Sequence, residues 1–428
     1  MNLEKQSTNL QMTLREVNRV GEGQKNVPKL RFKGYEDAWE QRKFGEISQR
    51  VQGNDGRMNL PTLTISAAYG WMDQIDRFSG NIAGTEQKNY TLLKKGELSY
   101  NHGNSKLAKY GAVFELSTYE EALVPKVYHS FRMIKGDSKF IEFLFATKLP
   151  DRELSKLISS GARMDGLLNI TYSDFATINL TVPSEAEQNM VSNCLKALDD
   201  LLTLHQRKYD ALKSMKKILL SKMFPKNGED VPEIRFKEFT DAWEQRKLGE
   251  VSQIVGGGTP STGIPEYWDG DIDWYSPVEI GEEIFVSCSQ RKITQLGLEK
   301  SSAKILPEGT VLFTSRAGIG NTAILEKEGC TNQGFQSIVP KDNELDSYFI
   351  FSCSHLLKKY GETKGAGSTF VEISGKQMSL MPLNIPEIKE QKSVGNFFRK
   401  LDSIITLHQR KLEELKNMKK TLLQQMFV

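Results

Sequence analysis

Two blocks of this chain occur twice, and the duplication constrains the fold more than any other feature. Residues 27–49 (VPKLRFKGYEDAWEQRKFGEISQ) return as residues 231–253 with 16 of 23 positions identical. Residues 187–224 return as residues 390–427 with 21 of 38 positions identical. The segments between the blocks show no comparable match. Two near-identical surfaces suit two copies of one partner, and two unlike inserts suit two unlike ligands.

The second block of each half has the spacing of a long helix. From Val191 to Met223, and again from Val394 to Met426, seam positions follow one another at alternating intervals of four and three residues. This is a heptad pattern sustained for more than four repeats. A helix over the 41 residues from 184 to 224 would be roughly 60 Å long at about 1.5 Å per residue.

Pro183 and Pro386 mark the expected helix starts, because each is followed at once by acidic, helix-forming residues. The apolar seam of each helix must be covered, and the other copy is the nearest complementary surface. We therefore predict an intramolecular antiparallel coiled coil with pseudo-twofold symmetry. His205 and His408 occupy equivalent seam positions, and we interpret them as polar residues that set the register rather than as a metal site.

The two inserts have strand-like runs separated by glycine-containing turns, which indicates mixed α/β domains (class α/β, or α+β). Both show an apolar strand, a small polar loop, a glycine and a second apolar strand, as expected of distant versions of one fold. The predicted organisation begins with an N-terminal arm of uncertain role, either loosely ordered or helical. It continues with the first insert domain, first helix, linker, second insert domain and second helix. The corresponding residues are 1–26, 27–182, 183–224, 225–230, 231–385 and 386–428.

Composition excludes several classes. With 38% hydrophobic and 26% charged residues, the chain is typical of a soluble globular protein. It lacks an apolar run of about 18 residues and an apolar leader, so we expect a cytoplasmic protein with no membrane partner. The four cysteines are widely spaced, which favours reduced structural thiols. The net charge of +3 says little, but both helices are locally basic, either as phosphate-binding or partner-docking faces or as ordinary solvated faces.

Catalytic motifs are missing from the sequence. It has no G-x-x-x-x-G-K-[ST] loop, no H-E-x-x-H and no G-x-S-x-G. The short GIG at 318–320 and GAG at 365–367 lack the third glycine of a dinucleotide fingerprint, so we interpret both as turns. The chain is therefore not expected to be an enzyme or to bind a metal or cofactor itself.

Polar loops in the inserts instead suit the reading of base edges. Arginine pairs with guanine, and asparagine or glutamine with adenine, through two hydrogen bonds in the major groove. Candidates in the first insert are Tyr100, Asn101, His102, Asn104, Ser105 and Lys106. Candidates in the second insert are Ser315, Arg316, Asn321, Asn332 and Gln333 beside Phe335. Two such loops on unlike domains would read two unlike sequences.

Together these motifs resemble the DNA-specificity subunit of type I restriction-modification systems. The resemblance rests on the two-repeat plan, the P-x-x-x-E-Q lead-ins at 183–188 and 386–391, and the TLHQRK-containing helices. It also rests on the runs GGTPSTGIPEYWDGDIDWYSP, TSRAGIGNTAI and TNQGF of the second insert. The resemblance covers nearly everything after residue 26.

The resemblance implies a noncatalytic subunit for host defence and DNA methylation. Each insert would be a target recognition domain that reads one half of a bipartite, asymmetric site in double-stranded DNA, with the paired helices fixing the unread spacer. Two copies of a methylation subunit would bind the repeated scaffold, and translocase-nuclease restriction subunits could join. S-adenosylmethionine, ATP and Mg would be bound by those partners, and methylation would require adenine to be flipped from the duplex.

Two other functions stay open at this stage. The chain could be an assembly scaffold whose two inserts bind proteins, in which case its interactions would be insensitive to salt. A fused restriction-methylation enzyme is disfavoured because methyltransferase motifs are missing from the sequence. The base sequence and the spacer length are not deducible from loop residues.

Overall fold

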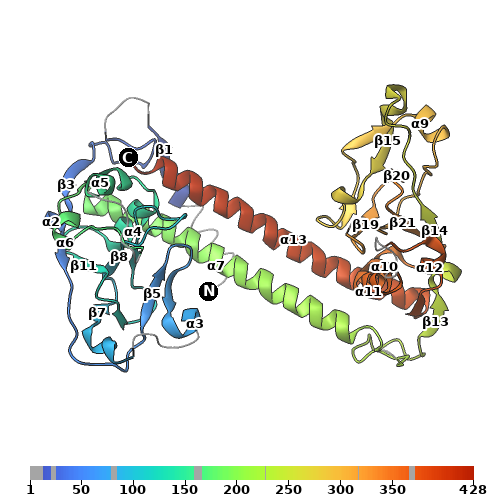
Figure 1. The fold of residues 1–428 in the computed structure, drawn as a ribbon, viewed down its shortest axis with the longest axis horizontal. Coiled ribbons are helices and arrows are strands. Elements are labelled where there is room, and N and C mark those ends of the chain that lie inside the picture. The colour runs from blue at the N-terminus through green and yellow to red at the C-terminus, as the bar shows by residue number, and fades with distance from the viewer. Residues whose placement is uncertain are drawn as a thin grey trace. The chain divides into compact units, whose positions relative to one another are not determined.

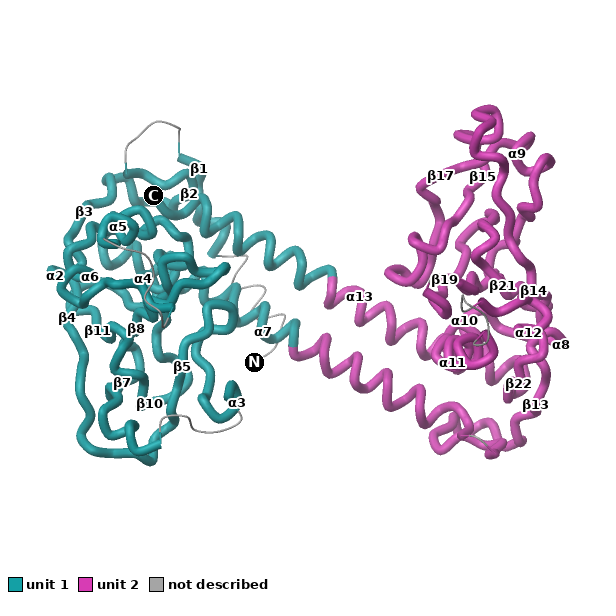
Figure 2. Tube along the Cα trace, in the orientation of Figure 1, with its two compact units in different colours: residues 1–206, 410–428 teal, residues 207–409 magenta. Residues whose placement is uncertain are grey.

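The chain forms two compact units (Figure 2). The computed structural model describes residues 13–20, 26–78, 84–158, 166–226, 228–316, 318–365 and 372–428. The first unit comprises residues 1–206 and 410–428, and the second comprises residues 207–409. Each unit therefore contains one insert, one copy of the N-terminal block and a part of each long helix.

The two predicted long helices are present (Figure 1). They are α7 (Glu185–Lys222) and α13 (Ile388–Gln425), each 38 residues long. In the first unit Lys419 Nζ lies 2.5 Å from Asp199 Oδ1, and in the second unit Lys216 Nζ lies 2.6 Å from Asp402 Oδ1. Lys216 and Lys419 are equivalent in the repeat, so the same ion pair joins the helices in both units.

The direction of the helix pair can be determined in the second unit. Lys216 of α7 pairs with Asp402 of α13, whereas Phe224, further along the chain, stacks on Phe398, which precedes Asp402. When the residue numbers of successive contacts rise in one helix and fall in the other, the two helices must pack antiparallel. The predicted antiparallel pairing is confirmed there.

The N-terminal block is attached to the start of the long helix by the same contacts in both units. In the first unit β3 (Glu40–Lys43) pairs with β12 (Asn179–Val182), and in the second β13 (Glu244–Lys247) pairs with β22 (Pro382–Ile385), all antiparallel. Arg31 donates two hydrogen bonds to Glu187, at 2.7 and 2.8 Å. Arg235 and Glu390 repeat that pair, with both distances 2.7 Å.

The glutamine of each P-x-x-x-E-Q lead-in also has a definite structural role. Gln188 Nε2 donates to the carbonyl oxygen of Pro183, and its Oε1 accepts from the backbone N–H of Asp137, at 3.0 and 2.9 Å. Gln391 repeats both bonds with Pro386 and Asp346. The repeated motif thus joins the helix start to the loop that caps a short helix of the insert.

Each insert contains its own four-stranded antiparallel sheet, and the two sheets have the same strand order. The two inserts are therefore versions of one fold. In chain order the strands lie first, fourth, second, third in both sheets. In the first unit they are β4 (Ser48–Arg50), β8 (Leu98–Asn101), β9 (Ala112–Glu115) and β11 (His129–Met133). In the second they are β14 (Ser252–Gly256), β18 (Val311–Phe313), β19 (Thr322–Leu325) and β21 (Gln336–Pro340).

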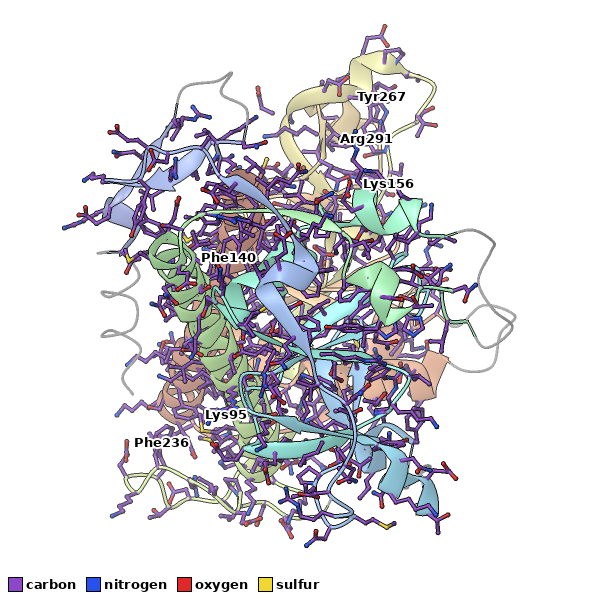
Figure 3. The ribbon with its side chains drawn as sticks, turned by 90° about the vertical axis from the view of Figure 1, so that its left-hand side faces the viewer. Lys95, Phe140, Lys156, Phe236, Tyr267 and Arg291 are labelled. Atoms are coloured by element: carbon purple, nitrogen blue, oxygen red, sulfur yellow. The ribbon has the colours of Figure 1, made fainter. Side chains whose placement is uncertain are left out.

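The inserts differ in what they add to this sheet. The first adds two separate antiparallel pairs, β5 (Leu63–Ser66) with β6 (Gly70–Asp73) and β7 (Thr91–Lys94) with β10 (Glu121–Val124). The second adds β16 (Phe285–Val286) to the sheet edge and a second sheet of β15 (Trp268–Tyr275), β17 (Arg291–Ile293) and β20 (Cys330–Thr331). In this second sheet Arg291 lies 3.7 Å from the centre of the Trp268 ring, close to Tyr267 (Figure 3).

Short helices complete each unit. Those of the first unit are α2 (Phe44–Ile47), α3 (Gln74–Phe78), η1 (Gly84–Asn89), α4 (Ser138–Ala146), α5 (Asp151–Lys156) and α6 (Tyr172–Phe175). Those of the second are α8 (Leu248–Val251), η2 (Pro265–Tyr267), η3 (Pro277–Glu279), α9 (Gln295–Glu299), α10 (Ser347–Ser352), α11 (Ser354–Gly365) and α12 (Gly375–Ser379). Phe140 of α4, labelled in Figure 3, is fully buried and stacks on Phe427 with ring centres 5.2 Å apart.

The four cysteines are free thiols, as expected. Three are buried, and burial raises the pKa of Cys194 to about 11 and that of Cys330, with a smaller effect of Asp273, to about 12. Cys288 is exposed. Within the described ranges, no helix is both long and apolar enough to cross a membrane.

Part of the N-terminal arm pairs with the repeated block. Strand β1 (Val17–Arg19) pairs antiparallel with β2 (Leu30–Phe32), at the start of the repeated block. Residues 13–15 of the arm are helical, in agreement with one of the two predicted states, whereas the strand pairing of residues 17–19 differs from the prediction. It follows because residues 30–32 would otherwise form an unpaired strand edge. Residues 1–12 and 21–25 of the arm lie outside the described residues.

Candidate nucleic-acid interface

The two inserts, residues 50–182 and 254–385, are called the first and second heads from here on. The two loops selected from the sequence are the same connection in the two heads. The β8–β9 loop (residues 102–111) leaves the first sheet after the pair Asn101–Ala112. The β18–β19 loop (residues 314–321) leaves the second sheet after the pair Phe313–Thr322. Because the four strands have the same order in both sheets, each loop leaves the corresponding ends of the same two strands.

Two of the first-head candidates do not reach solvent. Tyr100 is fully buried on β8, and its hydroxyl donates to the carbonyl oxygen of Tyr110 at 2.7 Å. Burial, followed by the charge of Asp151, raises the pKa of this phenol well above its ordinary value. His102 is also buried, between the carbonyl oxygens of Leu168 and Val127. Both side chains are therefore buried beneath the loop and contact backbone carbonyl oxygens there.

The other first-head candidates are accessible. Asn104, Ser105 and Lys106 are exposed, and the backbone N–H of Asn104 donates to the carbonyl oxygen of Gly166 at 2.9 Å. Asn101 is half-buried, and its side chain bridges the N–H of Gly103 and the carbonyl oxygen of Ile65. The tip of the loop thus offers amide, hydroxyl and ammonium groups on a braced backbone.

A residue that the sequence reasoning missed lies at the neighbouring hairpin. The carbonyl oxygen of Ile65 accepts hydrogen bonds from Asn101 Nδ2 and from Arg77 Nη1. The bond from Asn101 joins the β5–β6 hairpin to the start of the β8–β9 loop. Tyr69 occupies the turn of this hairpin with 81% of its side chain exposed. The available signal was an aromatic residue beside a glycine in the short turn SAAYGW.

The structure brings the two predicted segments of the second head together. Thr314 and Phe335 form an isolated bridge, and the N–H of Ser315 donates to the carbonyl oxygen of Gly334 at 2.8 Å. Ser315 itself is fully buried, and its hydroxyl makes no hydrogen bond within the described residues. Its backbone joins the loops, and its side chain does not face solvent.

Two polar side chains lie beside Gly334, and a third belongs to Gln333, the residue before it. A Cβ atom at this glycine would lie 3.0 Å from Asn332 Oδ1 and 3.6 Å from Arg316 Nε. Gln333 is exposed and accepts a hydrogen bond from Thr259. Arg316 is 38% exposed, and Glu372 is its nearest carboxylate at 4.0 Å. The guanidinium of Arg316 and the amide of Asn332 therefore lie close together, and the exposed Gln333 follows Asn332 in the chain. These three residues are named here the Arg316 cluster (Arg316, Asn332 and Gln333).

Asn321 lies at the base of the β18–β19 loop and braces it. Its N–H donates to Thr314 Oγ1 at 2.9 Å, and its Nδ2 donates to the carbonyl oxygen of Ile280 at 3.1 Å. Gly318 and Gly320 have the left-handed backbone expected of turns, with φ of 103° and 95°. Val278, next to Pro277 at the edge of the Arg316 cluster, is 88% exposed and was not predicted.

The structure shows what surrounds one seam histidine and two lysines of the long helices. Within the described residues, no group of His, Cys, Asp and Glu side chains is placed to hold a metal. His408 is half-buried, and partial burial, followed by the charge of Lys208, lowers its pKa. Two helix lysines, Lys216 and Lys419, are engaged in the interhelical ion pairs described above.

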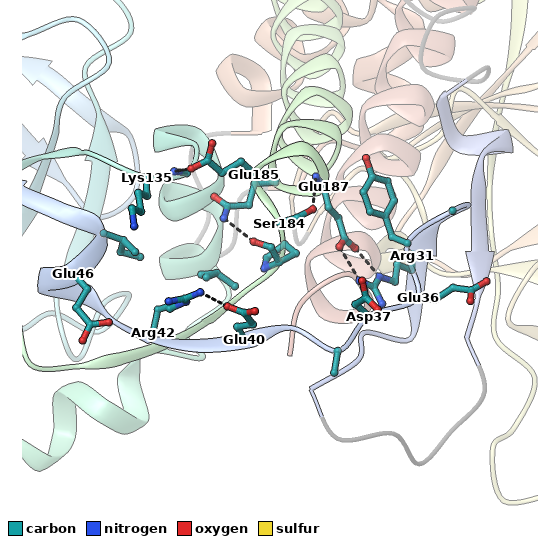
Figure 4. A pocket seen from close by; sticks show the side chains of 18 residues that line it. Arg31, Glu36, Asp37, Glu40, Arg42, Glu46, Lys135, Ser184, Glu185 and Glu187 are labelled. Carbon is teal, nitrogen blue, oxygen red and sulfur yellow. Dashed lines mark hydrogen bonds and ion pairs between the residues drawn. The ribbon is translucent and has the colours of Figure 1, made fainter.

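A second accessible feature belongs to the repeated scaffold. A cavity of about 580 Å³ in the first unit is lined by the N-terminal block and the start of α7 (Figure 4). Carboxylates predominate in its wall, with the basic side chains of Arg31, Arg42 and Lys135 among them. The acidic lining residues are Glu36, Asp37, Glu40, Glu46, Glu185 and Glu187.

Comparison with known proteins identifies the domain of the second half. Residues 240–417 match the family described as type I restriction modification DNA specificity domain. The type I restriction enzyme MjaIX specificity subunit of Methanocaldococcus jannaschii is 34% identical over 190 residues, which cover 44% of each chain. The EcoR124I/EcoR124II specificity subunit of Escherichia coli is 28% identical over 181 residues, which cover 40% of this chain and 43% of that one. The matched region thus spans less than half the length of these two relatives.

A solved structure extends the similarity of fold over almost the whole chain. The S subunit of a type I restriction-modification system from M. genitalium superposes with a TM-score of 0.60 at 16% identity. The superposition covers 94% of this chain and 99% of that chain. At this identity the likeness shows that the two chains share a fold.

Proposed function

We propose that the chain is a specificity subunit of a type I restriction-modification system, a noncatalytic reader of a bipartite, asymmetric DNA site. Each head reads one half of the site, and the paired helices set the length of the unread spacer. Recognition modules on a rigid support contact major-groove faces about 34–36 Å apart per helical turn. A 38-residue helix, about 57 Å long, is sufficient to set such a spacing.

One observation carries this proposal. Both heads are built on the same four-stranded sheet, and the same connection of each sheet carries the exposed polar loop. The loops themselves differ in length and in residues. A common sheet with different loop residues is the arrangement expected when two domains bind the same kind of ligand, DNA, but must recognise different base sequences.

The accessible loop residues are the proposed base-reading and phosphate-binding groups. In the first head these are Asn104 and Lys106, with Tyr69 of the adjoining hairpin. In the second head the Arg316 cluster provides the guanidinium and amides that pair with guanine and adenine. Asn101, Asn321, Tyr100 and Ser315 keep a proposed role in DNA binding as supports of these loops.

The repeated scaffold is the proposed attachment surface for two methylation subunits. The Arg–Glu pair, the glutamine lead-in and the β-strand pair occur in both units, so one partner surface could bind to either. The acidic cavity of Figure 4 fits a partner segment that contains lysine or arginine. S-adenosylmethionine, ATP and Mg would be bound by the methylation and restriction subunits.

Exchanging one head is expected to change one half of the recognised site. Residues 50–182 are replaced by the corresponding head of a specificity subunit that reads another sequence, and the complex with the methylation subunit is used to map methylated sites. The half read by the first head changes, and the other half and the scaffold contacts stay the same. A change in both halves would contradict independent reading by the heads.

The same complex separates DNA reading from protein scaffolding. Affinity for DNA must fall steeply with salt, because binding releases counterions from the phosphates. The measurement is the dissociation constant of a duplex with the mapped site between about 50 and 200 mM salt, a range over which 6–10 phosphate contacts lose 10³–10⁵ in affinity. Salt-insensitive binding of proteins without any DNA shift would favour the assembly-scaffold function.

Arg316→Ala is expected to weaken and relax reading of the second half. Loss of a bidentate arginine contact costs about 1–3 kcal/mol and removes the preference at the base that it contacts. The measurement is competition among duplexes substituted at each position of the second half. Lys237→Ala removes one exposed positive charge from the repeated block and serves as the control, which should leave the base preferences unchanged.

A further inference from the structure

Val278 presents an apolar side chain to solvent in the second head. It is 88% exposed, more than any other large hydrophobic residue that the structure describes. Single exposed apolar residues are common on protein surfaces, so this exposure alone does not indicate a site. Val278 differs from such residues in two ways, because its turn is held by several hydrogen bonds and because that turn borders the Arg316 cluster.

The turn that carries Val278 is the short helix η3, and its backbone is well restrained. Pro277 occupies the first position, where its ring fixes the φ angle. Glu279 Oε2 accepts hydrogen bonds from the N–H and the hydroxyl of Ser276, at 2.8 and 2.6 Å. Glu279 Oε1 accepts from the N–H of Gln290 at 2.7 Å. Val278 therefore has a fixed backbone position, and both oxygens of the carboxylate next to it are engaged within the protein.

Both ends of this turn are bonded to the segments of the proposed base-reading site. The N–H of Asn332 donates to the carbonyl oxygen of Tyr275 at 3.0 Å. At the other end, Asn321 Nδ2 donates to the carbonyl oxygen of Ile280 at 3.1 Å. Tyr275 and Ile280 are themselves buried. The turn is thus fixed to the β18–β19 loop and to residues 331–335.

Pro277 lies beside the polar groups of the Arg316 cluster. A Cβ atom placed on Gly334 would lie 2.9 Å from Pro277 Cγ. The same point is 3.0 Å from Asn332 Oδ1 and 3.6 Å from Arg316 Nε. Val278 is one residue from that proline, a step of about 3.8 Å between Cα atoms. An exposed apolar side chain therefore borders the amide and the guanidinium that are proposed to read base edges.

The major groove offers an apolar side chain one specific partner. The C5-methyl group of thymine is the apolar group on the base edges there, and the other groups are hydrogen-bond donors and acceptors. Arginine reads guanine, whose base pair carries no such methyl group, so the thymine belongs to a nearby base pair. Bases of one strand are stacked about 3.4 Å apart, so the distances above allow a separation of up to about three base pairs.

We propose that Val278 is a specificity-determining residue of the second head, and that it contacts the C5-methyl group of a thymine near the guanine that Arg316 reads. This inference rests on the proposed function of the two heads. The contact removes the methyl group and the valine side chain from water, which is favourable. The second half of the site must then contain an A·T pair within about three base pairs of that guanine.

The experiment replaces each thymine of the second half by uracil, one at a time, in duplexes bound by the complex with the methylation subunit. Uracil keeps the hydrogen-bonding groups of thymine and lacks only the methyl group, so hydrogen-bonded reading is unaffected. At one position the affinity should fall about fourfold, which corresponds to roughly 0.8 kcal/mol for one apolar carbon group removed from water. Competition with Arg316→Ala locates the guanine, and the thymine should lie within about three base pairs of it.

Variants of Val278 assign this effect to its side chain. Val278→Ala should bind the thymine and uracil duplexes almost equally, whereas Val278→Ile should keep the preference because its side chain is still apolar and branched. Leu380→Ala is the matched control in the same head and should keep the preference for thymine. Leu380 is 50% exposed and follows Ser379, which lies against Gly249 of the repeated block.

The outcomes separate this inference from the proposed function. A loss with Val278→Ala that is equal for thymine and uracil duplexes would indicate another kind of contact and overturn the inference. A uracil effect that persists in Val278→Ala, or a second half with no A·T pair at the required distance, would also overturn it. In each of these cases binding of the intact site leaves the proposed function standing. Failure to bind any duplex would remove the proposed function and this inference together.

Discussion

Glu187→Ala is expected to destabilise the first unit by about 3–5 kcal/mol, the range for removing one partner of a buried ion pair. Arg31 and Glu187 are 4% and 2% exposed, so the guanidinium would stay buried with no counter-charge. Arg31 Nη1 already has no hydrogen-bond partner within the described residues. The variant removes both bonds that the other two nitrogens make. The measurement is urea-induced unfolding followed by a probe in the first unit.

A double replacement distinguishes loss of the pair from general damage to the core. Arg31→Met with Glu187→Met removes both charges together, and replacement of a buried pair by apolar residues is often close to neutral. Glu390→Ala is the matched change in the second unit, and it should cost less. Arg235 is 11% exposed and keeps a bond to the carbonyl oxygen of Asp241. Equal losses in all three proteins would refute this account.

Gly257→Ala is expected to abolish reading of the second half while the first half is still read. A Cβ atom at Gly257 would lie 2.0 Å from the carbonyl oxygen of Asn332 and 2.3 Å from that of Thr331. Backbone atoms cannot yield as a flexible side chain can, so the 331–335 segment must move. That segment holds two members of the Arg316 cluster. We expect at least the 1–3 kcal/mol typical of overpacking.

Gly263→Ala is the control in the same glycine-rich run. Nothing lies within 4 Å of a Cβ atom at Gly263, so its replacement should leave both stability and base preference unchanged. Methylation mapping with each variant provides the comparison. If Gly257→Ala reads the second half normally, contact between the 256–263 segment and the Arg316 cluster is not needed for recognition.

The scaffold was predictable because its signals are repeated and periodic. The heptad spacing predicted both long helices, and duplication predicted their pairing, since each apolar seam needs a cover. The bonds of Arg31 with Glu187 and of Arg235 with Glu390 were not predicted. They join residues 156 and 155 positions apart, and one sequence carries no signal of such distant partners.

The candidate site was predicted less completely, because composition does not show which face of a strand a side chain occupies. The sequence selected the two equivalent loops and the TNQGF segment, which the structure brings to its partner loop. It could not separate buried Tyr100 and Ser315 from exposed Lys106 and Gln333, since all are polar residues in or beside turns. Tyr69 and Val278 were missed because exposed hydrophobic residues resemble core residues in a sequence.

The paired residues at the loop bases have a consequence for how such a protein diversifies. Asn101 and Ala112 close the first loop, and Phe313 and Thr322 close the second, although the loops have different lengths. Insertions, deletions and substitutions between these anchors leave the hydrogen-bonded ladder untouched. Under the proposed function, new base preferences can therefore arise from changes at the loop tips, without any compensating change in the repeated scaffold.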